Sequence, residues 1–406
     1  MRIHPFRALR PPVALAADVA SPPYDVVDTA QARVLAEGNE NSFLHIVRPE
    51  IDLPEGTELY DDSVYEQAKK NFDAFVERGS LVRDEEPSVF LYEVTMGGHS
   101  QTGLVATCHV EDYEKDLIKK HEKTLQAKED DRTRHVDTLN AQAGPIFLTY
   151  RADASMDELV DQAKQQDPVY SFVAPDGVQH RVWRMIDAEP FQQAFENVPV
   201  TYVADGHHRS ASAARVARMR ADANPAHDGT EPYNWFLTVL FPDDQLRIMA
   251  YNRIVQDLNG LDLDSFLQRV GERFDVQASG VSKPACATDI SMYLAGTWYT
   301  LSWTPTGDED PVTGLDVSVL QQSLLAPILG IDDPRTSTRI KFMGGIHGAE
   351  GLQREVDGRG DGVAFALYPT SVDQLMAIAD ADQIMPPKST WFEPKLRSGL
   401  FINIME

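Results

Sequence analysis

The chain has 406 residues, of which 42% are hydrophobic and 9% aromatic. This length exceeds what one hydrophobic core usually organises and the composition is that of globular proteins, so we expect two domains and exclude a largely disordered chain. A formal net charge of −26 repels nucleic-acid backbones and anionic membranes, so we expect neither as a partner, and any phosphorylated ligand needs a local basic pocket.

The sequence also indicates a compartment. Two cysteines in the whole chain suit a reducing environment. An arginine-containing N-terminus before a short apolar stretch weakly resembles a signal peptide, but Pro11 and Pro12 interrupt it. No apolar run approaches the ~20 residues that cross a bilayer. We therefore expect a cytoplasmic protein.

Hydrophobic periodicity and turn signals predict an alternation of helices and strands in the first part of the chain. In chain order we expect a turn at 21–26, a helix at 63–78, a hairpin of 89–95 and 101–110, a strand at 146–150, a helix at 156–165, strands at 179–186 and 198–204, a helix at 210–223 and a strand at 235–241.

A new helix–strand series begins after Asn252, and we place a domain boundary near residue 255. The elements expected in this second part are a helix at 263–273, strands within 292–303, a helix at 317–329, a strand at 339–343, a strand at 362–368 and a helix at 371–380. The tail around Lys388 is rich in proline, polar and cationic residues, which is typical of a pocket lid or of plain surface.

The segment Asp205-Gly206-His207-His208-Arg209 connects an apolar strand to an alanine-rich helix. A helix start presents free N–H groups and the positive end of the helix dipole, and it binds anions. Gly206 lets a phosphate approach the backbone, Arg209 offers a bidentate fork, and the histidines can donate hydrogen bonds. Asp205 is unusual in such a site unless it holds a metal ion or accepts a proton. In the alternative interpretation, Asp205 is a helix cap and the histidines are surface residues.

A second candidate segment extends from residue 121 to 132. If the whole segment is helical, His121, Thr124, Lys128 and Arg132 lie within an arc of about 80°. Glu122 lies beside this stripe, where it could act as a base or a metal ligand. A solvated, salt-bridged helix face is the competing interpretation.

Two further positions are candidates, since Asp25 follows two prolines that present its carboxylate rigidly and Lys388 stands in the polar tail loop. No zinc-peptidase motif, serine-hydrolase elbow or P-loop is found.

Residues 22–26, 121–132, 205–209 and 385–390 resemble, in this order, signature blocks of the DUF1015 family. The block at 205–209 also resembles the phosphate-binding turn of the ParB/sulfiredoxin superfamily, which includes CTP-binding partition proteins, sulfiredoxins and free serine kinases. Sulfiredoxin has a cysteine where this chain has His207 or His208, so a sulfinic-acid reductase is not expected. The resemblance implies an α+β fold, with a ParB/sulfiredoxin-like N-terminal domain with insertions at 1–255. A smaller α/β C-terminal domain is implied at 256–406, with a tail loop that closes the pocket.

By this resemblance the chain would be a phosphotransferase that moves a phosphoryl group between ATP or ADP and a small hydroxyl metabolite, serine or phosphoserine, with Mg²⁺. A phosphoserine phosphatase and a non-catalytic nucleotide or metabolite sensor are the alternatives. The expected phosphate-binding residues are Gly206, His207, His208, Arg209, His121, Thr124, Lys128, Arg132 and Lys388. The expected catalytic residues are Glu122, Asp205, His208 and Asp25, of which Glu122 and Asp205 would also hold the metal. The oligomeric state is left open.

Overall fold

The computed structural model describes residues 1–305, 307 and 310–406. The chain divides into two compact units, which we call unit 1 (Met1–Leu246 with Pro394–Glu406) and unit 2 (Arg247–Glu393). The sequence places the boundary near residue 255, whereas unit 2 begins at Arg247. The last residues return to unit 1, so the tail is not part of the unit that precedes it.

Unit 1 is built on a large mixed sheet with strand order β6-β11-β8-β12-β5-β4-β10-β9, and β1 pairs with β5. Its strands are β1 (Ile3–His4), β4 (Val89–Met96), β5 (His99–His109), β6 (Ile118–Lys119), β8 (Ile146–Tyr150), β9 (Tyr170–Val173), β10 (Gln179–Met185), β11 (Thr201–Asp205) and β12 (Trp235–Pro242). The pairs β11/β6 and β12/β8 are parallel and the other pairs of this sheet are antiparallel. The predicted hairpin is confirmed as β4 and β5.

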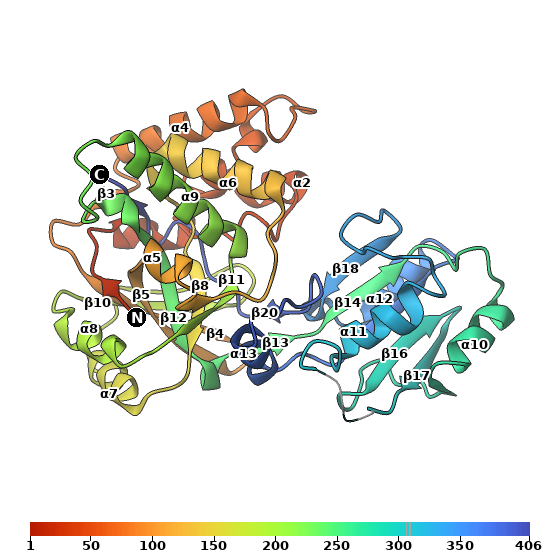
Figure 1. The fold of residues 1–406 in the computed structure, drawn as a ribbon. Helices are drawn as coiled ribbons and strands as arrows, with labels where there is room; N and C mark the ends of the chain where they lie inside the picture. Colours follow the sequence, from red (N-terminus) through yellow and green to blue (C-terminus); the bar gives the residue numbers. More distant parts are fainter. Residues whose placement is uncertain (306, 308–309) are drawn as a thin grey trace. The chain divides into compact units, whose positions relative to one another are not determined.

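Helices α4, α6 and α9 lie in a row beside this sheet (Figure 1). The helices of unit 1 are α1 (Ala16–Val19), α2 (Thr29–Ala36), α3 (Leu44–Val47), α4 (Asp62–Glu77), α5 (Val110–Glu114), α6 (Gln126–Leu139), α7 (Ala154–Ala163), α8 (Glu189–Glu196) and α9 (His207–Ala223). Apolar residues of the sheet, such as Leu91, Leu148 and Val203, form one core with Ala213 and Val216 of α9. This core fixes the position of the α9 start relative to the sheet.

A second core joins the N-terminal helices to the chain's end. It includes Phe43 of the α2–α3 connection, Phe72 of α4, Leu139 of α6 and Ile402 of the tail. The tail is held by backbone bonds between Leu9 and Ile402 and by pairing of β21 (Asn403–Ile404) with β7 (Ala141–Gln142). The C-terminus therefore belongs to the structure that holds the α9 start.

Unit 2 has a six-stranded sheet in the order β15-β17-β16-β19-β14-β18, and all its pairs are antiparallel. Its strands are β13 (Ile248–Met249), β14 (Tyr251–Val255), β15 (Asp275–Ala278), β16 (Asp289–Leu294), β17 (Thr297–Ser302), β18 (Ile340–Gly344), β19 (Val363–Leu367) and β20 (Trp391–Phe392), and its helices are α10 (Leu263–Gly271), α11 (Asp316–Leu320), α12 (Gly348–Asp357) and α13 (Val372–Asp380). A π-helical turn follows α11 at Gln321–Leu325. The α+β class is thus confirmed.

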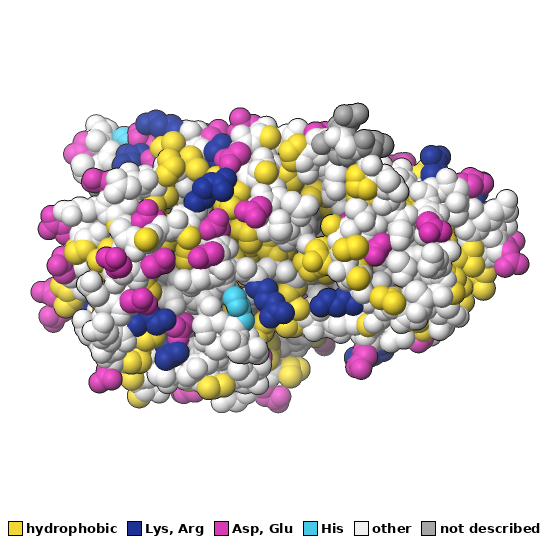
Figure 2. Space-filling model, turned by 90° about the horizontal axis from the view of Figure 1, so that it is seen from below, with side chains coloured by type: hydrophobic (Ala, Val, Ile, Leu, Met, Phe, Trp, Pro, Cys, Tyr) yellow, Lys and Arg dark blue, Asp and Glu magenta, His cyan; other side chains and the backbone are white. Residues whose placement is uncertain are grey.

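The surface reflects the composition. On the face seen in Figure 2, acidic side chains (magenta) are spread widely, while lysine and arginine side chains (dark blue) form small groups. Among the helices of the described residues, none is both long and apolar enough to span a membrane.

Candidate functional site

The candidate site is built around the start of α9. Strand β11 is buried up to Ala204, and Gly206 then precedes the helix with φ 104° and ψ 32°. L side chains rarely adopt this conformation, so glycine is required here. Gly206 is therefore the helix cap, not Asp205 as in the alternative interpretation, and no side chain of the described residues caps this helix start.

Arg209 folds back over this glycine. A Cβ built on Gly206 would lie 3.0 Å from Arg209 Nε and 3.2 Å from Nη2. Nη1 donates a hydrogen bond to the carbonyl oxygen of Pro145, and Nη2 lies 3.6 Å from Asp205 Oδ1. Nε is buried and has no hydrogen-bond partner among the described residues. The guanidinium thus keeps an unused donor beside the positive end of the α9 dipole.

His121 and His207 form a buried pair next to this turn. Their ring centroids are 4.5 Å apart and the rings are nearly perpendicular. Burial lowers the pKa of His207 to about 3 and holds the pKa of His121 well below its ordinary value. Both nitrogens of His121 and Nε2 of His207 lack hydrogen-bond partners within the described chain. At neutral pH both rings are neutral, so each supplies a donor and an acceptor but no positive charge.

His208 has a different environment from its neighbour. Its Nε2 accepts a hydrogen bond from the backbone N–H of Leu125, at 3.1 Å, so its proton lies on Nδ1. Leu125 is the residue that precedes α6. His208 therefore joins the first turns of α6 and α9.

The predicted helical stripe from His121 to Arg132 is wrong in its first part, because α6 begins only at Gln126. His121 and Thr124 lie in the irregular segment before it. Two contacts favour this late start: His208 takes up the amide of Leu125, and Thr124 Oγ1 donates to Glu129 Oε2 at 3.1 Å. The first contact takes up a backbone N–H with a side chain from α9, and the second ties the segment before α6 to a side chain in its first turn. Helical periodicity in the sequence does not register either contact.

The second half of the stripe does lie on α6. The Arg132 guanidinium carbon is 4.1 Å from the centre of the Tyr24 ring, and Nη2 is 2.7 Å from Asp131 Oδ2. Asp131 also accepts a hydrogen bond from the Tyr65 hydroxyl at 2.8 Å. Lys128 is exposed on the same helix. Arg132 is thus a fixed, half-buried cation, whereas Lys128 is exposed.

Two adjoining cavities bring three of the predicted segments together. A small cavity of about 40 Å³ is lined by both Arg132 and Arg209. A cleft of about 450 Å³, within the range of small-molecule sites, is lined by Asp25, Lys128 and Arg132. Tyr24 lines both cavities, as does Arg132. The turn at Asp25, helix α6 and the start of α9 therefore meet.

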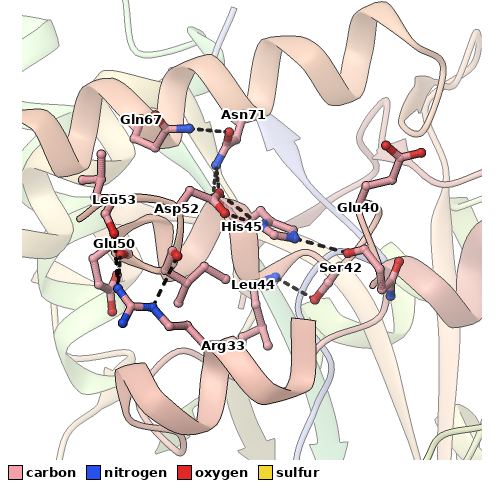
Figure 3. Close-up of polar contacts among 12 residues, drawn as sticks. Arg33, Glu40, Ser42, Leu44, His45, Glu50, Asp52, Leu53, Gln67 and Asn71 are labelled. Atoms are coloured by element: carbon pink, nitrogen blue, oxygen red, sulfur yellow. Dashed lines mark hydrogen bonds and ion pairs between the residues drawn. The ribbon is translucent and has the colours of Figure 1, made fainter. Parts of the chain in front are cut away.

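Polar contacts among the N-terminal helices hold the wall of this cleft that Pro49 and Glu50 form (Figure 3). Nδ1 of His45 lies 2.9 Å from Asp52 Oδ1, and Asn71 Nδ2 donates to Asp52 Oδ2 at 2.7 Å. Arg33 Nη2 donates to the carbonyl oxygen of Leu53 at 3.2 Å. These bonds hold α2, α3 and α4 around the 3₁₀ turn Pro49–Asp52, which lines the cleft through Pro49 and Glu50.

The three candidate acids have different surroundings. Asp25 is exposed in the cleft and Glu122 is half-buried between β6 and α6. Asp205 Oδ2 lies 3.1 Å from Lys395 Nζ. In the part of the chain that the structure describes, no group of three or more His, Cys, Asp or Glu side chains is arranged to hold a metal ion.

Lys388 belongs to unit 2, where its ammonium lies 5.5 Å from the centre of the Tyr251 ring. Its expected part in the pocket of unit 1 stays a prediction. The predicted site residues did not include Lys395. Its ammonium lies 3.1 Å from the carboxylate of Asp205, just before the α9 start. The sequence shows that the tail is rich in cationic residues. It does not show that the tail packs near α9, because that position depends on contacts between distant segments.

The chain belongs to the DUF1015 family, described as a protein of unknown function, whose family model matches residues 3–318. The resemblance to the DUF1015 family noted in the sequence is thereby confirmed. No curated protein sequence matches the chain.

Among solved structures, the chain is similar to C-terminally truncated SbnI from Staphylococcus aureus, with 12% identity, a TM-score of 0.41, and coverage of 72% of this chain and 85% of that one. It is also similar to a conserved hypothetical protein from Pyrococcus furiosus, with 11% identity, a TM-score of 0.38, and coverage of 74% and 95%. A free serine kinase in complex with AMP matches with 12% identity, a TM-score of 0.36, and coverage of 73% and 92%. These similarities are distant.

Proposed function

We propose that this DUF1015 protein binds the phosphate groups of a nucleotide, ATP or ADP, at the start of α9 and transfers a phosphoryl group to or from a small hydroxyl metabolite, serine or phosphoserine. The observation that carries the proposal is the set of unused donors at one helix start. These are the uncapped first turn after Gly206, the buried Nε of Arg209 and the imidazoles of His121 and His207. Buried donors without partners are uncommon in folded proteins, and an anionic ligand satisfies them.

Phosphoryl transfer requires positioned cations and an oriented acceptor hydroxyl. Arg209 would hold the nucleotide phosphates, with His207 and His121 as neutral donors. The acceptor would occupy the cleft that Lys128, Arg132 and Asp25 line. His208 would act by holding α6 in place, and Thr124 by ordering the segment before α6.

The base that accepts the hydroxyl proton would be Glu122, or Asp25 as second candidate. Asp205 is less suited, because its carboxylate is in an ion pair with Lys395. For the same reason Asp205 fits the role of a metal ligand poorly in this arrangement. Magnesium is commonly held by one or two carboxylates together with phosphate oxygens and water, and Glu122 is the protein group that we propose for it. Bound Mg²⁺ would neutralise charge on the transferred phosphoryl group.

The binding part of the proposal is tested with Arg209→Ala. The thermal unfolding of wild type should shift upward with ADP, ATP, CTP or phosphoserine, and this shift should vanish in the variant. Arg215→Ala is the matched control, since Arg215 lies on the same helix in an exposed ion pair with Asp130. A shift that is as large in Arg209→Ala as in wild type contradicts the proposal.

The reaction is tested by incubating the protein with phosphoserine or serine and a nucleotide, with and without Mg²⁺. Transfer of a phosphoryl group from the nucleotide to serine, or from phosphoserine to the nucleotide, supports the phosphotransferase. Inorganic phosphate released from phosphoserine without a nucleotide indicates the phosphatase instead. A ligand that stabilises the protein but yields no product indicates a sensor.

A further inference from the structure

Lys395 reaches the α9 start from a firmly anchored segment. Its neighbour Arg397 donates to Asp176 and to His180, and Ser398 exchanges two backbone hydrogen bonds with Ser21, at 2.9 and 3.1 Å. The Lys395 side chain is only 16% exposed. Its ammonium is therefore held at this place by the tail and does not sample the solvent like a surface lysine.

The carboxylate of Asp205 lies between two cations. Oδ2 is 3.1 Å from Lys395 Nζ and Oδ1 is 3.6 Å from Arg209 Nη2. Asp205 also directly precedes Gly206, at the positive end of the α9 dipole. A carboxylate in these surroundings takes the place that a phosphate oxygen would take among the same donors.

A second observation indicates that the site accepts more than this carboxylate. Nε2 of His207, a residue that is 5% exposed, has no hydrogen-bond partner among the described residues, and neither has Nε of Arg209. Asp205 thus satisfies only some of the donors that converge here. A group with three terminal oxygens can satisfy more of them.

We propose that Lys395 is a phosphate-binding residue of this site and that Asp205 is its built-in counter-ion, which the phosphate of the ligand replaces. This inference rests on the proposed function, and it adds roles for Lys395 and Asp205 that the proposed function does not assign. Asp205 then competes with the ligand for Lys395 and Arg209. Removal of the lysine should weaken anion binding, whereas removal of the Asp205 charge should strengthen it.

The test uses the full-length protein in Mg²⁺-free buffer with EDTA at low ionic strength. The affinities for inorganic phosphate and for ADP are measured by calorimetric titration for wild type, Lys395→Met, Lys395→Arg and Asp205→Asn. We expect Lys395→Met to lose at least tenfold in affinity for both probes, as a charge-assisted hydrogen bond is lost. Lys395→Arg should keep most of the affinity, and Asp205→Asn should gain several-fold for phosphate.

Lys341→Met is the matched control, because Lys341 forms an ion pair with Glu355 in unit 2, and it should bind both probes like wild type. Melting temperatures without ligand show whether a variant is folded. If wild type binds both probes and Lys395→Met binds them equally well, this inference fails while the proposed function stands. A loss of phosphate affinity in Asp205→Asn also overturns the counter-ion role. If wild type binds neither probe, the proposed function fails, and this inference with it.

Discussion

The guanidinium of Arg132 lies over the ring of Tyr24, with its central carbon 4.1 Å from the ring centre. The same guanidinium holds Asp131, with Nε at 2.8 Å and Nη2 at 2.7 Å from Oδ2. The turn after Pro22 and Pro23 is thereby fixed to α6 through one half-buried cation. The cleft at Asp25 depends on this contact, because Tyr24 and Arg132 both line it.

Replacing Arg132 with methionine should lower the free energy of unfolding by about 2 kcal/mol, because the half-buried Asp131 loses its cation and a charge-assisted hydrogen bond. The double variant Arg132→Met, Asp131→Asn should recover part of this loss, since no uncompensated charge remains. Urea denaturation of the three proteins measures both effects. Equal midpoints for wild type and the single variant would show that the ion pair contributes nothing.

Substituting Gly206 with alanine should weaken both folding and phosphate binding. The φ of 104° costs an L residue about 1–2 kcal/mol, and the new Cβ would lie 3.0 Å from Arg209 Nε and displace it. Gly177→Ala is the control, as Gly177 also has a positive φ (80°) but open space around its Cα. The control should lose stability and keep binding. If both variants bind phosphate like wild type, the contact of Gly206 with Arg209 has no part in the site.

The buried histidines should make the protein sensitive to acid. Burial lowers the pKa of His180 to about 3 and that of His135 to about 4. The unfolded chain takes up protons on these rings near pH 6.5 while the folded chain does not, so stability falls as pH drops below that value. His180→Gln should reduce the slope of unfolding free energy between pH 4.5 and 5.5 by about 1 kcal/mol per pH unit. An unchanged slope in urea titrations would show that folded His180 binds the proton as well.

His45 should act in the opposite direction. Its hydrogen bonds with Asp52, at 2.9 and 3.0 Å, raise its pKa above the ordinary value. A raised pKa in the folded state adds stability that is fully present below about pH 6.5 and is lost as pH rises through the folded pKa. His45→Gln should therefore lower the melting temperature more at pH 6 than at pH 8.5. Equal losses at both pH values would assign His45 a packing role only.

Local sequence was sufficient for most single elements of this protein. The periodicity between 63 and 78 predicts α4, the alternation on both sides of Gly97 and Gly98 predicts the β4–β5 hairpin, and the apolar strand before Asp205 predicts β11. These patterns succeed because burial on one face of a helix or strand imposes its own period. The pattern failed before Gln126, where His208, far away in the chain, takes up the amide that an earlier helix start would have used.

The prediction of an anion site at the start of α9 needs only the sequence, because a glycine between a buried strand and a helix, followed by an arginine, has consequences that are local. Only the tertiary structure decided what surrounds it. It places Arg132 and Arg209 on one cavity, buries His121 against His207 so that both rings stay neutral, and brings Lys395 to Asp205 across 190 residues. Such contacts depend on packing between distant segments and on the loss of water around each group, and neither is encoded in the neighbouring residues.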